Sequence, residues 1–282
     1  MTGLVGGRGS RPPIVATVGD DERDESVFVV GDVHGHLSEL ITALHTAGLT
    51  TPEGQWSGGR HRLWFLGDFV DRGPEGIGVI ELVMRLSDQA DRAGGFVGSL
   101  LGNHEVLLLG MHLFGDTPVP SDYGFRSFAR SWHLNGGQLS DQTRLTDRHV
   151  RWLADRPVAV VVDDHLLLHS DTTAYLSWGD TVDEVNTAVK AIMHGRELTD
   201  WWDCWHKMTT RFAFRGASGA QTADEIMGKF GGKRIVHGHS IIADQLGIEP
   251  DQVDGPLSYA DDKVLAVDGG LFDGGPCLVV EL

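Results

Sequence analysis

The chain of 282 residues has a globular composition, with 41% hydrophobic, 8% aromatic and 22% charged residues, which excludes a disordered chain. Its 40 acidic and 23 basic residues give a formal net charge of −17 at pH 7. We expect no nucleic-acid partner, because a polyanion would meet long-range repulsion from this charge.

Residues 1–25 are predicted to form a flexible N-terminal tail. They contain no apolar segment long enough for a signal peptide or a membrane span, so we expect no membrane partner. The two cysteines, Cys204 and Cys277, do not resemble a secreted disulfide framework. These features favour a cytoplasmic, enzyme-sized domain over residues 26–282.

Short apolar runs alternate with helical patterns over the first hundred residues. Buried strands are predicted for residues 27–30, for the LWFL run at 63–66 and for the FVGSLL run at 96–101. Apolar residues at helical spacing predict helices over 37–49 and from Pro74 to Leu86. This alternation of strand and helix predicts an α/β domain with a largely parallel central sheet.

The middle of the chain changes character. Residues 111–156 mix loop signals with helical stretches, and we interpret them as a cap or insertion. A hairpin is predicted around Asp163 and Asp164, followed by a helical region over about 183–230 with a tryptophan-rich patch. The segments RIVHGH, VLAVDGG and CLVVEL return to strands, and no repeat or linker divides the chain. One compact α/β domain is therefore expected.

Three of the apolar runs end in the same way, with a glycine followed by side chains that commonly bind metals. The segments are VVGDVHGH, FLGDFVDRG and LLGNHE. Because sites in open α/β sheets assemble at the carboxyl ends of the strands, these side chains should converge at one edge. They are Asp32, His34, Asp68, Asp71, Arg72, Asn103, His104 and Glu105, and two later strand ends add His169, His237 and His239.

The donor types predict a divalent metal centre. Imidazole and carboxylate groups both suit Mn, Fe or Zn, whereas calcium loops use oxygen ligands alone. The number of such groups exceeds what one ion needs, so two ions bridged by a carboxylate fit better.

Five motifs together resemble those of the calcineurin-like metallophosphoesterases. GDVHG, GDFVDRG and GNHE, followed by a lone histidine and GHS, look most like the phosphoprotein phosphatase branch and its bacterial relatives. The motifs run in order from residue 31 to 240 and cover most of the chain. The resemblance implies central β-sheets flanked by helices, an αββα sandwich, with a helical cap insertion.

The resemblance implies two divalent metal ions, Mn first, with Fe, Zn, Ni or Mg as alternatives. The implied ligands are Asp32 and His34 for the first ion, Asp68 bridging both, and Asn103, His169 and His239 for the second. Two departures from the family pattern leave local roles open. Ser170 and Asp171 replace the usual glycines of the fourth motif, and His237 is expected near the site or in the core.

The resemblance also implies catalytic roles. His104 would act as general acid, oriented by Asp71, and Arg72 would clamp the phosphate. Arg215, in FRGASG, matches a second phosphate-binding arginine in type and approximate spacing. A planar guanidinium suits bidentate phosphate binding better than an ammonium group does.

The implied function is a phosphatase that hydrolyses phosphate monoesters, of Ser/Thr phosphoproteins or a small metabolite, by attack of a metal-bound hydroxide. The alternative is a phosphoanhydride hydrolase like the symmetric diadenosine tetraphosphate hydrolases, which typically depart from the DRG that is intact here. An inactive metal-binding scaffold is a third hypothesis, disfavoured by the intact His104, Asp71 and Arg72. The sequence leaves open the physiological substrate, the metal and the oligomeric state.

Overall fold

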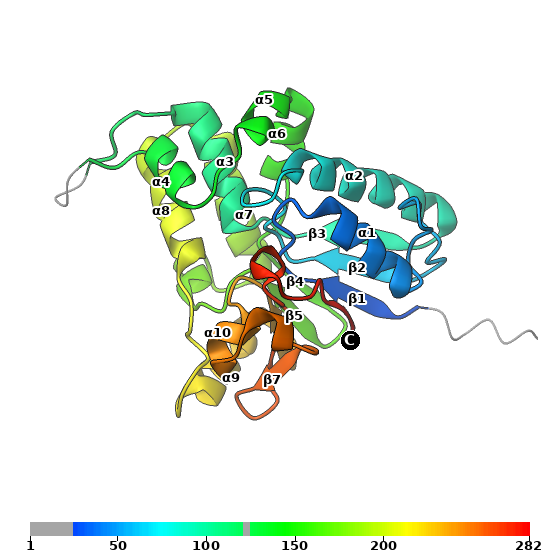
Figure 1. Ribbon diagram of the computed structural model, residues 1–282. Coiled ribbons are helices and arrows are strands. Elements are labelled where there is room, and N and C mark those ends of the chain that lie inside the picture. The colour runs from blue at the N-terminus through cyan, green and yellow to red at the C-terminus, as the bar shows by residue number, and fades with distance from the viewer. Residues whose placement is uncertain (1–24, 121–124) are drawn as a thin grey trace, which may run out of the picture.

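Two β-sheets stacked face to face form the centre of the structure, a computed structural model that describes residues 25–120 and 125–282 (Figure 1). All of the predicted flexible tail except Glu25 lies outside the described residues. The apolar side chains of both sheets meet in a shared core, and helices cover their outer faces. The predicted two-sheet sandwich flanked by helices is confirmed.

The elements follow the predicted order along the chain. The strands are β1 (Val27–Val30), β2 (Arg62–Phe65), β3 (Phe96–Ser99), β4 (Ala159–Val162), β5 (His165–Leu168), β6 (Arg234–His237), β7 (Leu257–Tyr259), β8 (Val264–Ala266) and β9 (Val279–Glu281). The α-helices are α1 (Leu37–Thr46), α2 (Gly76–Ala93), α3 (Asn103–Phe114), α4 (Phe128–Leu134), α5 (Leu139–Arg144), α6 (Asp147–Ala154), α7 (Val182–His194), α8 (Leu198–Thr209), α9 (Gly219–Phe230) and α10 (Ile242–Leu246). Short 3-10 helices span Ala174–Ser177, Pro250–Gln252 and Leu271–Asp273.

Both sheets are mixed, and their antiparallel pairs lie at the edges. The first sheet has the order β3-β2-β1-β9, in which only β9 runs antiparallel to its neighbour. The second has the order β4-β5-β6-β8-β7, in which β5, β6 and β8 are parallel and the edge strands β4 and β7 are antiparallel. The expectation of one largely parallel sheet is thus corrected, because the hairpin at Asp163–Asp164 and the C-terminal strand add antiparallel edges.

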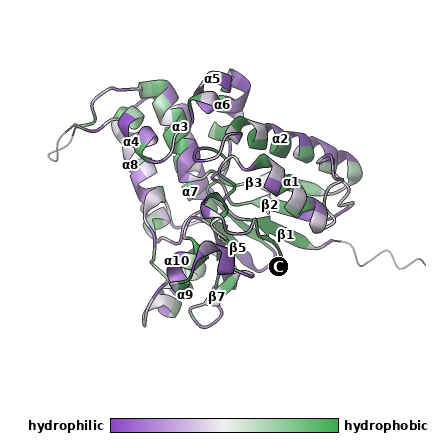
Figure 2. Ribbon diagram, in the orientation of Figure 1, coloured by the Kyte–Doolittle hydropathy of each residue, from purple (hydrophilic) through white to green (hydrophobic). Residues whose placement is uncertain are grey.

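Strand β1 shows why strands of these sheets have continuous apolar sequences. Successive side chains of a strand point to opposite faces. Val27 and Val29 pack into the core between the sheets with Leu167 of β5, whereas Phe28 and Val30 pack toward the helices. Both faces of β1 are therefore buried, and Figure 2 shows this strand as hydrophobic, while the covering helix α2 carries both hydrophobic and hydrophilic residues.

The middle of the chain is helical, as predicted. The proposed cap over residues 111–156 contains the last turn of α3 and helices α4, α5 and α6, and the region over 183–230 contains α7, α8 and α9. Helix α3 packs against both α4 and α8, and the α8 residues Trp201 and Trp205 are buried. Whether the 111–156 segment acts as a cap stays a prediction. Within the described ranges, no helix is both long and apolar enough to cross a membrane.

Loops from both sheets meet at one edge of the sandwich. They follow the carboxyl ends of β1, β2 and β3 in the first sheet and of β5, β6 and β8 in the second. Because these strands are parallel within each sheet, their carboxyl ends lie on the same side. This topology brings together the motif residues that the sequence analysis singled out.

Candidate active site

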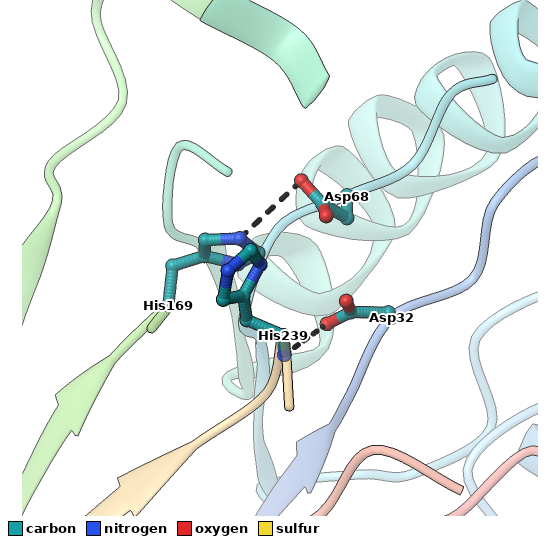
Figure 3. Close-up of side chains that lie close together, drawn as sticks. All are labelled: Asp32, Asp68, His169 and His239. Atoms are coloured by element: carbon teal, nitrogen blue, oxygen red, sulfur yellow. Dashed lines mark hydrogen bonds and ion pairs between the residues drawn. The ribbon is translucent and has the colours of Figure 1, made fainter. Parts of the chain in front are cut away.

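Four buried side chains from both sheets face one another at this edge. Asp32, Asp68, His169 and His239 each offer a ligand atom, and these atoms lie within 4.8 Å of one another. Figure 3 shows the two imidazoles on one side of the group and the two carboxylates pointing toward them from the other. His169 Nε2 lies 3.4 Å from Asp68 Oδ1, and the backbone N–H of His239 donates to Asp32 Oδ1 at 3.0 Å. The group has the composition of a transition-metal site.

A second buried group shares one member with the first. His34, Asp68 and His104 also offer ligand atoms within 4.8 Å of one another. His34 Nε2 lies 3.8 Å from Asp68 Oδ2 and 3.9 Å from Asp32 Oδ2. Asp68 therefore has one oxygen near each group, which is the position that a bridging carboxylate requires.

The environment of His169 fits a cation. Its Nδ1 lies 2.8 Å from the Leu66 carbonyl oxygen, so Nδ1 carries the proton and donates it there. The lone pair of Nε2 then faces Asn103 Oδ1 at 2.8 Å and Asp68 Oδ1 at 3.4 Å. Three acceptor atoms converge, and a metal ion would satisfy all three.

His34 and His239, like His169, each have a backbone carbonyl bound to one ring nitrogen. His34 Nδ1 donates to the Val70 carbonyl at 2.9 Å, which leaves Nε2 facing the two aspartates. His239 Nε2 donates to the Thr209 carbonyl at 3.1 Å, which leaves Nδ1 as its lone-pair atom. Such bonds fix the tautomer and orientation of metal-binding imidazoles.

Burial favours the neutral form of four predicted ligands. It lowers the pKa of His34, His169 and His239, which favours the neutral imidazole. Burial, followed by the charges of Asp268 and Asp68, raises the pKa of Asp32 well above its ordinary value. Buried carboxylates that repel one another are stabilised by a cation between them.

Asp268 is a member of this acidic group that the sequence analysis missed. It is buried at the end of β8, and its Oδ1 accepts the backbone N–H of Gly270 at 2.9 Å. Burial raises its pKa to about 6, and the charge of Asp68 contributes in the same direction. The signal was present in VLAVDGG, an apolar run followed by an acidic residue and glycine.

His104, a member of the second group, forms a buried pair with Asp71, which belongs to neither group. His104 Nδ1 lies 2.8 Å from Asp71 Oδ2, and the His104 backbone N–H donates to Asp68 Oδ1 at 2.9 Å. Arg72 Nη2 lies 3.4 Å from His104 Nε2, and its guanidinium stacks 3.8 Å from the ring centroid of Phe272. The pair and the arginine thus lie at the same edge as the predicted ligands.

Five of these residues have left-handed backbone conformations. Their φ angles lie between 47° and 67°, in a region that non-glycine residues rarely occupy. The residues are His34, Asp68, Asp71, Arg72 and His239. Surrounding hydrogen bonds hold the turns in place, because the backbone N–H groups of Val33 and His34 both donate to the Asp68 carbonyl.

Glu105 holds two of the site loops together. Its carboxylate accepts the backbone N–H groups of Asp68 at 2.8 Å, Phe69 at 2.7 Å and Gly102 at 2.9 Å. The side chain is fully buried at the first turn of α3. It therefore ties the loop after β2 to the start of the helix that carries Asn103.

Arg215, which the resemblance implies as a second phosphate-binding residue, lies against Phe212, and its role at the phosphate stays a prediction. Its guanidinium lies 3.9 Å from the ring centroid of Phe212. Burial lowers the pKa of His237, and the positive charge of Arg215 lowers that pKa further. The positive charge of Arg215 therefore acts on His237.

Arg211, which the sequence analysis did not consider, has a positive charge that acts on two of the predicted ligands. Burial lowers the pKa of His169 and His239, and the positive charge of Arg211 lowers both further. Its side chain is exposed. Both arginines lie four residues apart in TRFAFRG, so approximate spacing did not distinguish them.

His237 and the residues that replace the usual glycines have structural partners. His237 is buried and its Nε2 lies 2.8 Å from the Tyr259 hydroxyl. Asp171 accepts the Ser240 hydroxyl at 2.5 Å and the Phe212 backbone N–H at 2.9 Å. Ser170 donates its backbone N–H to the Tyr175 hydroxyl at 3.2 Å. Asp171 thus links the loop that carries Arg211 to the segment that follows His239.

Known proteins resemble the chain in both sequence and structure. Residues 26–242 match the family model for calcineurin-like phosphoesterases. Over 120 residues the chain is 31% identical to Shewanella-like protein phosphatase 2 of Arabidopsis thaliana, which covers 42% of this chain and 30% of that relative. Over 192 residues it is 29% identical to a symmetrical bis(5'-nucleosyl)-tetraphosphatase of Bordetella parapertussis, which covers 63% of this chain and 59% of that relative. The matches span less than two thirds of either relative.

A solved structure has the same fold. The cold-active protein-tyrosine phosphatase of a psychrophilic Shewanella sp. aligns with a TM-score of 0.68 at 23% sequence identity. The alignment covers 92% of this chain and 75% of that chain. At this identity, the likeness shows the shared fold alone.

Proposed function

Because the chain belongs to the calcineurin-like phosphoesterase family, we propose that it is a phosphatase that hydrolyses phosphate monoesters with two divalent metal ions. The observation that carries the proposal is the position of Asp68. Its carboxylate belongs to both ligand groups and accepts the backbone N–H of His104, whose ring contacts Asp71 and Arg72. Two metal sites, an anion-binding group and a proton donor are the parts that phosphoryl transfer needs.

The proposed ligands are divided between two ions, and Asp32 is assigned with His34 because it lies 3.9 Å from His34 Nε2 as well as near His169 and His239. They are Asp32, His34 and Asp68 for one ion and Asp68, Asn103, His169 and His239 for the other. When bound, the ions would lower the pKa of a coordinated water toward neutrality and offset the negative charge of the phosphate. Mn is the ion we propose first, and the donor set also suits Fe, Zn or Ni.

Arg72 is the proposed binding group for the substrate phosphate. Its guanidinium lines a hollow of about 520 Å³ together with Leu134 and Phe272. Stacking on Phe272 holds the guanidinium plane in one orientation, which favours two parallel hydrogen bonds to phosphate oxygens. The hollow gives the organic part of a phosphate monoester a place beside the arginine.

His104 is the proposed proton donor to the leaving group. Its Nδ1 bonds to Asp71, so the proton that it transfers is carried on Nε2, which lies 3.4 Å from Arg72 Nη2. A substrate bound to Arg72 would place its ester oxygen near this nitrogen. Protonation of the ester oxygen by His104 would let the leaving group depart as an alcohol and not as an alkoxide.

A hydrolysis screen with added Mn tests the proposal, with inorganic phosphate measured as the product of the monoesters and nucleoside diphosphates as the products of the dinucleoside tetraphosphates. It should compare p-nitrophenyl phosphate, phosphoserine, phosphothreonine and phosphotyrosine peptides, sugar phosphates and dinucleoside tetraphosphates. Faster release from monoesters than from dinucleoside tetraphosphates is expected. Release from none of them, by protein that holds two metal ions, would contradict a hydrolytic function.

The dinucleoside tetraphosphates are the second candidate substrate. The observation that favours them is the match to the symmetrical bis(5'-nucleosyl)-tetraphosphatase over 63% of this chain. Preferential release of two nucleoside diphosphates from such a substrate would replace the monoester proposal while leaving the metal proposal intact.

A further inference from the structure

Both carboxylate oxygens of Asp71 have a side-chain partner. Oδ2 lies 2.8 Å from His104 Nδ1, and Oδ1 accepts the indole N–H of Trp132 at 2.8 Å. The exposed fractions of Asp71, His104 and Trp132 are 0%, 2% and 1%, so bulk water cannot replace a lost partner. The three side chains form one chain of hydrogen bonds from α4 to the active site.

The segment that carries Trp132 also holds the backbone beneath this pair. The Gly136 carbonyl accepts the backbone N–H of Arg72 at 2.7 Å, and the Gln138 side-chain amide donates to the Arg72 carbonyl at 3.2 Å. The Asp141 carboxylate accepts the backbone N–H of Asp71 at 3.4 Å. Asp71 and Arg72 have φ angles of 67° and 65°, and these contacts hold them there.

The position of the indole ring is set by close packing. A Cβ added at Gly137 would lie 2.2 Å from the indole ring of Trp132, so only glycine lets the backbone pass there. The ring therefore has little freedom to turn away from Asp71. Close packing therefore holds the Trp132 indole in place as a hydrogen-bond donor to the Asp71 carboxylate.

We propose that Trp132 is a positioning residue for the proton donor of the reaction. Its indole N–H fixes the rotation of the Asp71 carboxylate, so that Oδ2 holds His104 Nδ1–H and Nε2 faces the substrate. This inference rests on the proposed function, in which His104 gives its proton to the leaving group. Trp132 acts only through Asp71 and has no contact with the predicted metal ligands in the part of the chain that the structure describes.

The matched variants are Trp132→Phe and Trp205→Phe. Both remove an indole N–H from a buried tryptophan, but the Trp205 N–H has no hydrogen-bond partner among the described residues. Trp132→Phe should lower kcat about tenfold or more on alkyl phosphates and change KM little. The loss should be smaller on p-nitrophenyl phosphate, because 4-nitrophenolate leaves with little protonation. Trp205→Phe should retain the wild-type values.

A structural role alone predicts a different pattern. General loosening of the site would lower kcat on both substrates equally or raise KM, and either result would overturn the proposal. Thermal melts of both variants show whether they fold. If Trp132→Phe does not fold, Gly137→Ala is the second variant, because its Cβ would displace the indole and should reproduce the dependence on the leaving group.

Nuclear magnetic resonance gives a readout that needs no turnover. In histidine-labelled protein, the His104 Nδ1–H resonance is assigned by its loss in His104→Asn. It should shift or broaden in Trp132→Phe and stay in place in Trp205→Phe. An unchanged resonance in Trp132→Phe would overturn the proposal. Absence of turnover by the wild type, with the expected shift present, would instead contradict the proposed function alone.

Discussion

Asp68 and Asp71 lie three residues apart in the loop after β2 and have different partners. Asp68 shares its carboxylate between the two ligand groups and accepts the backbone N–H of His104. Asp71 contacts His104 and Trp132 through its two oxygens and belongs to neither ligand group. Two residues of one type in one loop thus have separable roles.

This separation predicts opposite outcomes for two isosteric variants. Asp68→Asn should lose bound metal, because an amide cannot supply the charge that a shared ligand needs. Asp71→Asn should keep its metal and lose about 100-fold or more in kcat, because the amide no longer orients His104 as an anion does. Elemental analysis and kcat, measured on the same preparations, check the pair. Equal metal loss in both variants would contradict the assignment.

Asp268 predicts a dependence of stability on pH in the metal-free protein. Burial raises its pKa in the folded chain to about 6, above the ordinary 3.8. The folded state therefore binds more protons than the unfolded state between these values, and stability falls as the pH rises through them. Above pH 6 the ionised, buried carboxylate costs up to about 3 kcal/mol.

Asp268→Asn should remove this cost and still accept the Gly270 N–H. In the presence of a chelator, the melting temperature of the variant should exceed that of the wild type by several degrees at pH 7.5. At pH 4 the two should differ little, because the wild-type carboxyl is then protonated in the folded state. A variant that is less stable at pH 7.5 would show that the carboxylate is stabilising instead.

At the scale of elements, the loop after α8 carries two arginines whose charges act on different histidines. Asp171 accepts the backbone N–H of Phe212 and thereby fixes the loop between Arg211 and Arg215. The charge of Arg211 acts on His169 and His239, whereas that of Arg215 acts on His237. This arrangement makes Arg211 the stronger candidate for a second phosphate contact.

We therefore predict that Arg211→Ala lowers kcat/KM about 10- to 100-fold, mainly by raising KM, because a charge-assisted contact to the phosphate is lost. Inorganic phosphate should inhibit this variant more weakly than the wild type. Arg215→Ala is the matched control and should keep KM close to the wild-type value. A larger rise in KM for Arg215→Ala would restore the assignment made from sequence spacing.

The sequence predicts the elements better than their pairing. The strand over residues 27–30, the Asp163–Asp164 hairpin and the helices after the first two strands lie where their apolar patterns place them. The division into two sheets came only from the family resemblance, since strands buried on both faces have no alternation that tells which partner they face. No sequence pattern predicts the contact of α4 with Asp71, because Trp132 cannot be distinguished in the sequence from a tryptophan of the core.

At the scale of the whole molecule, the site depends on both sheets. Asp32, His34 and Asp68 follow strands of the first sheet, and His169 and His239 follow strands of the second. The motifs located these side chains in sequence, and the parallel strand order explains why they meet. Their tautomers and left-handed turns follow from tertiary hydrogen bonds, which no local pattern encodes.

Metal binding should therefore stabilise the molecule as a whole. A ligand that binds only the folded state adds about 2.7 kcal/mol when its concentration is 100 times Kd. Here it would also relieve the repulsion among the buried carboxylates of Asp32, Asp68 and Asp268. Removal of metal with a chelator should lower the melting temperature, and added Mn should restore it in a concentration-dependent way.

The Asp68→Asn variant distinguishes this site from incidental binding. With 40 acidic residues, the surface can bind Mn weakly at many places. Such binding would raise the melting temperature of the wild type and of Asp68→Asn alike. If Mn binds at the Asp68 carboxylate, Asp68→Asn should lose most of the increase in melting temperature. The two ligand groups of this variant no longer share an anion. Equal increases in both proteins would show that the two sheets are not joined through a metal at Asp68.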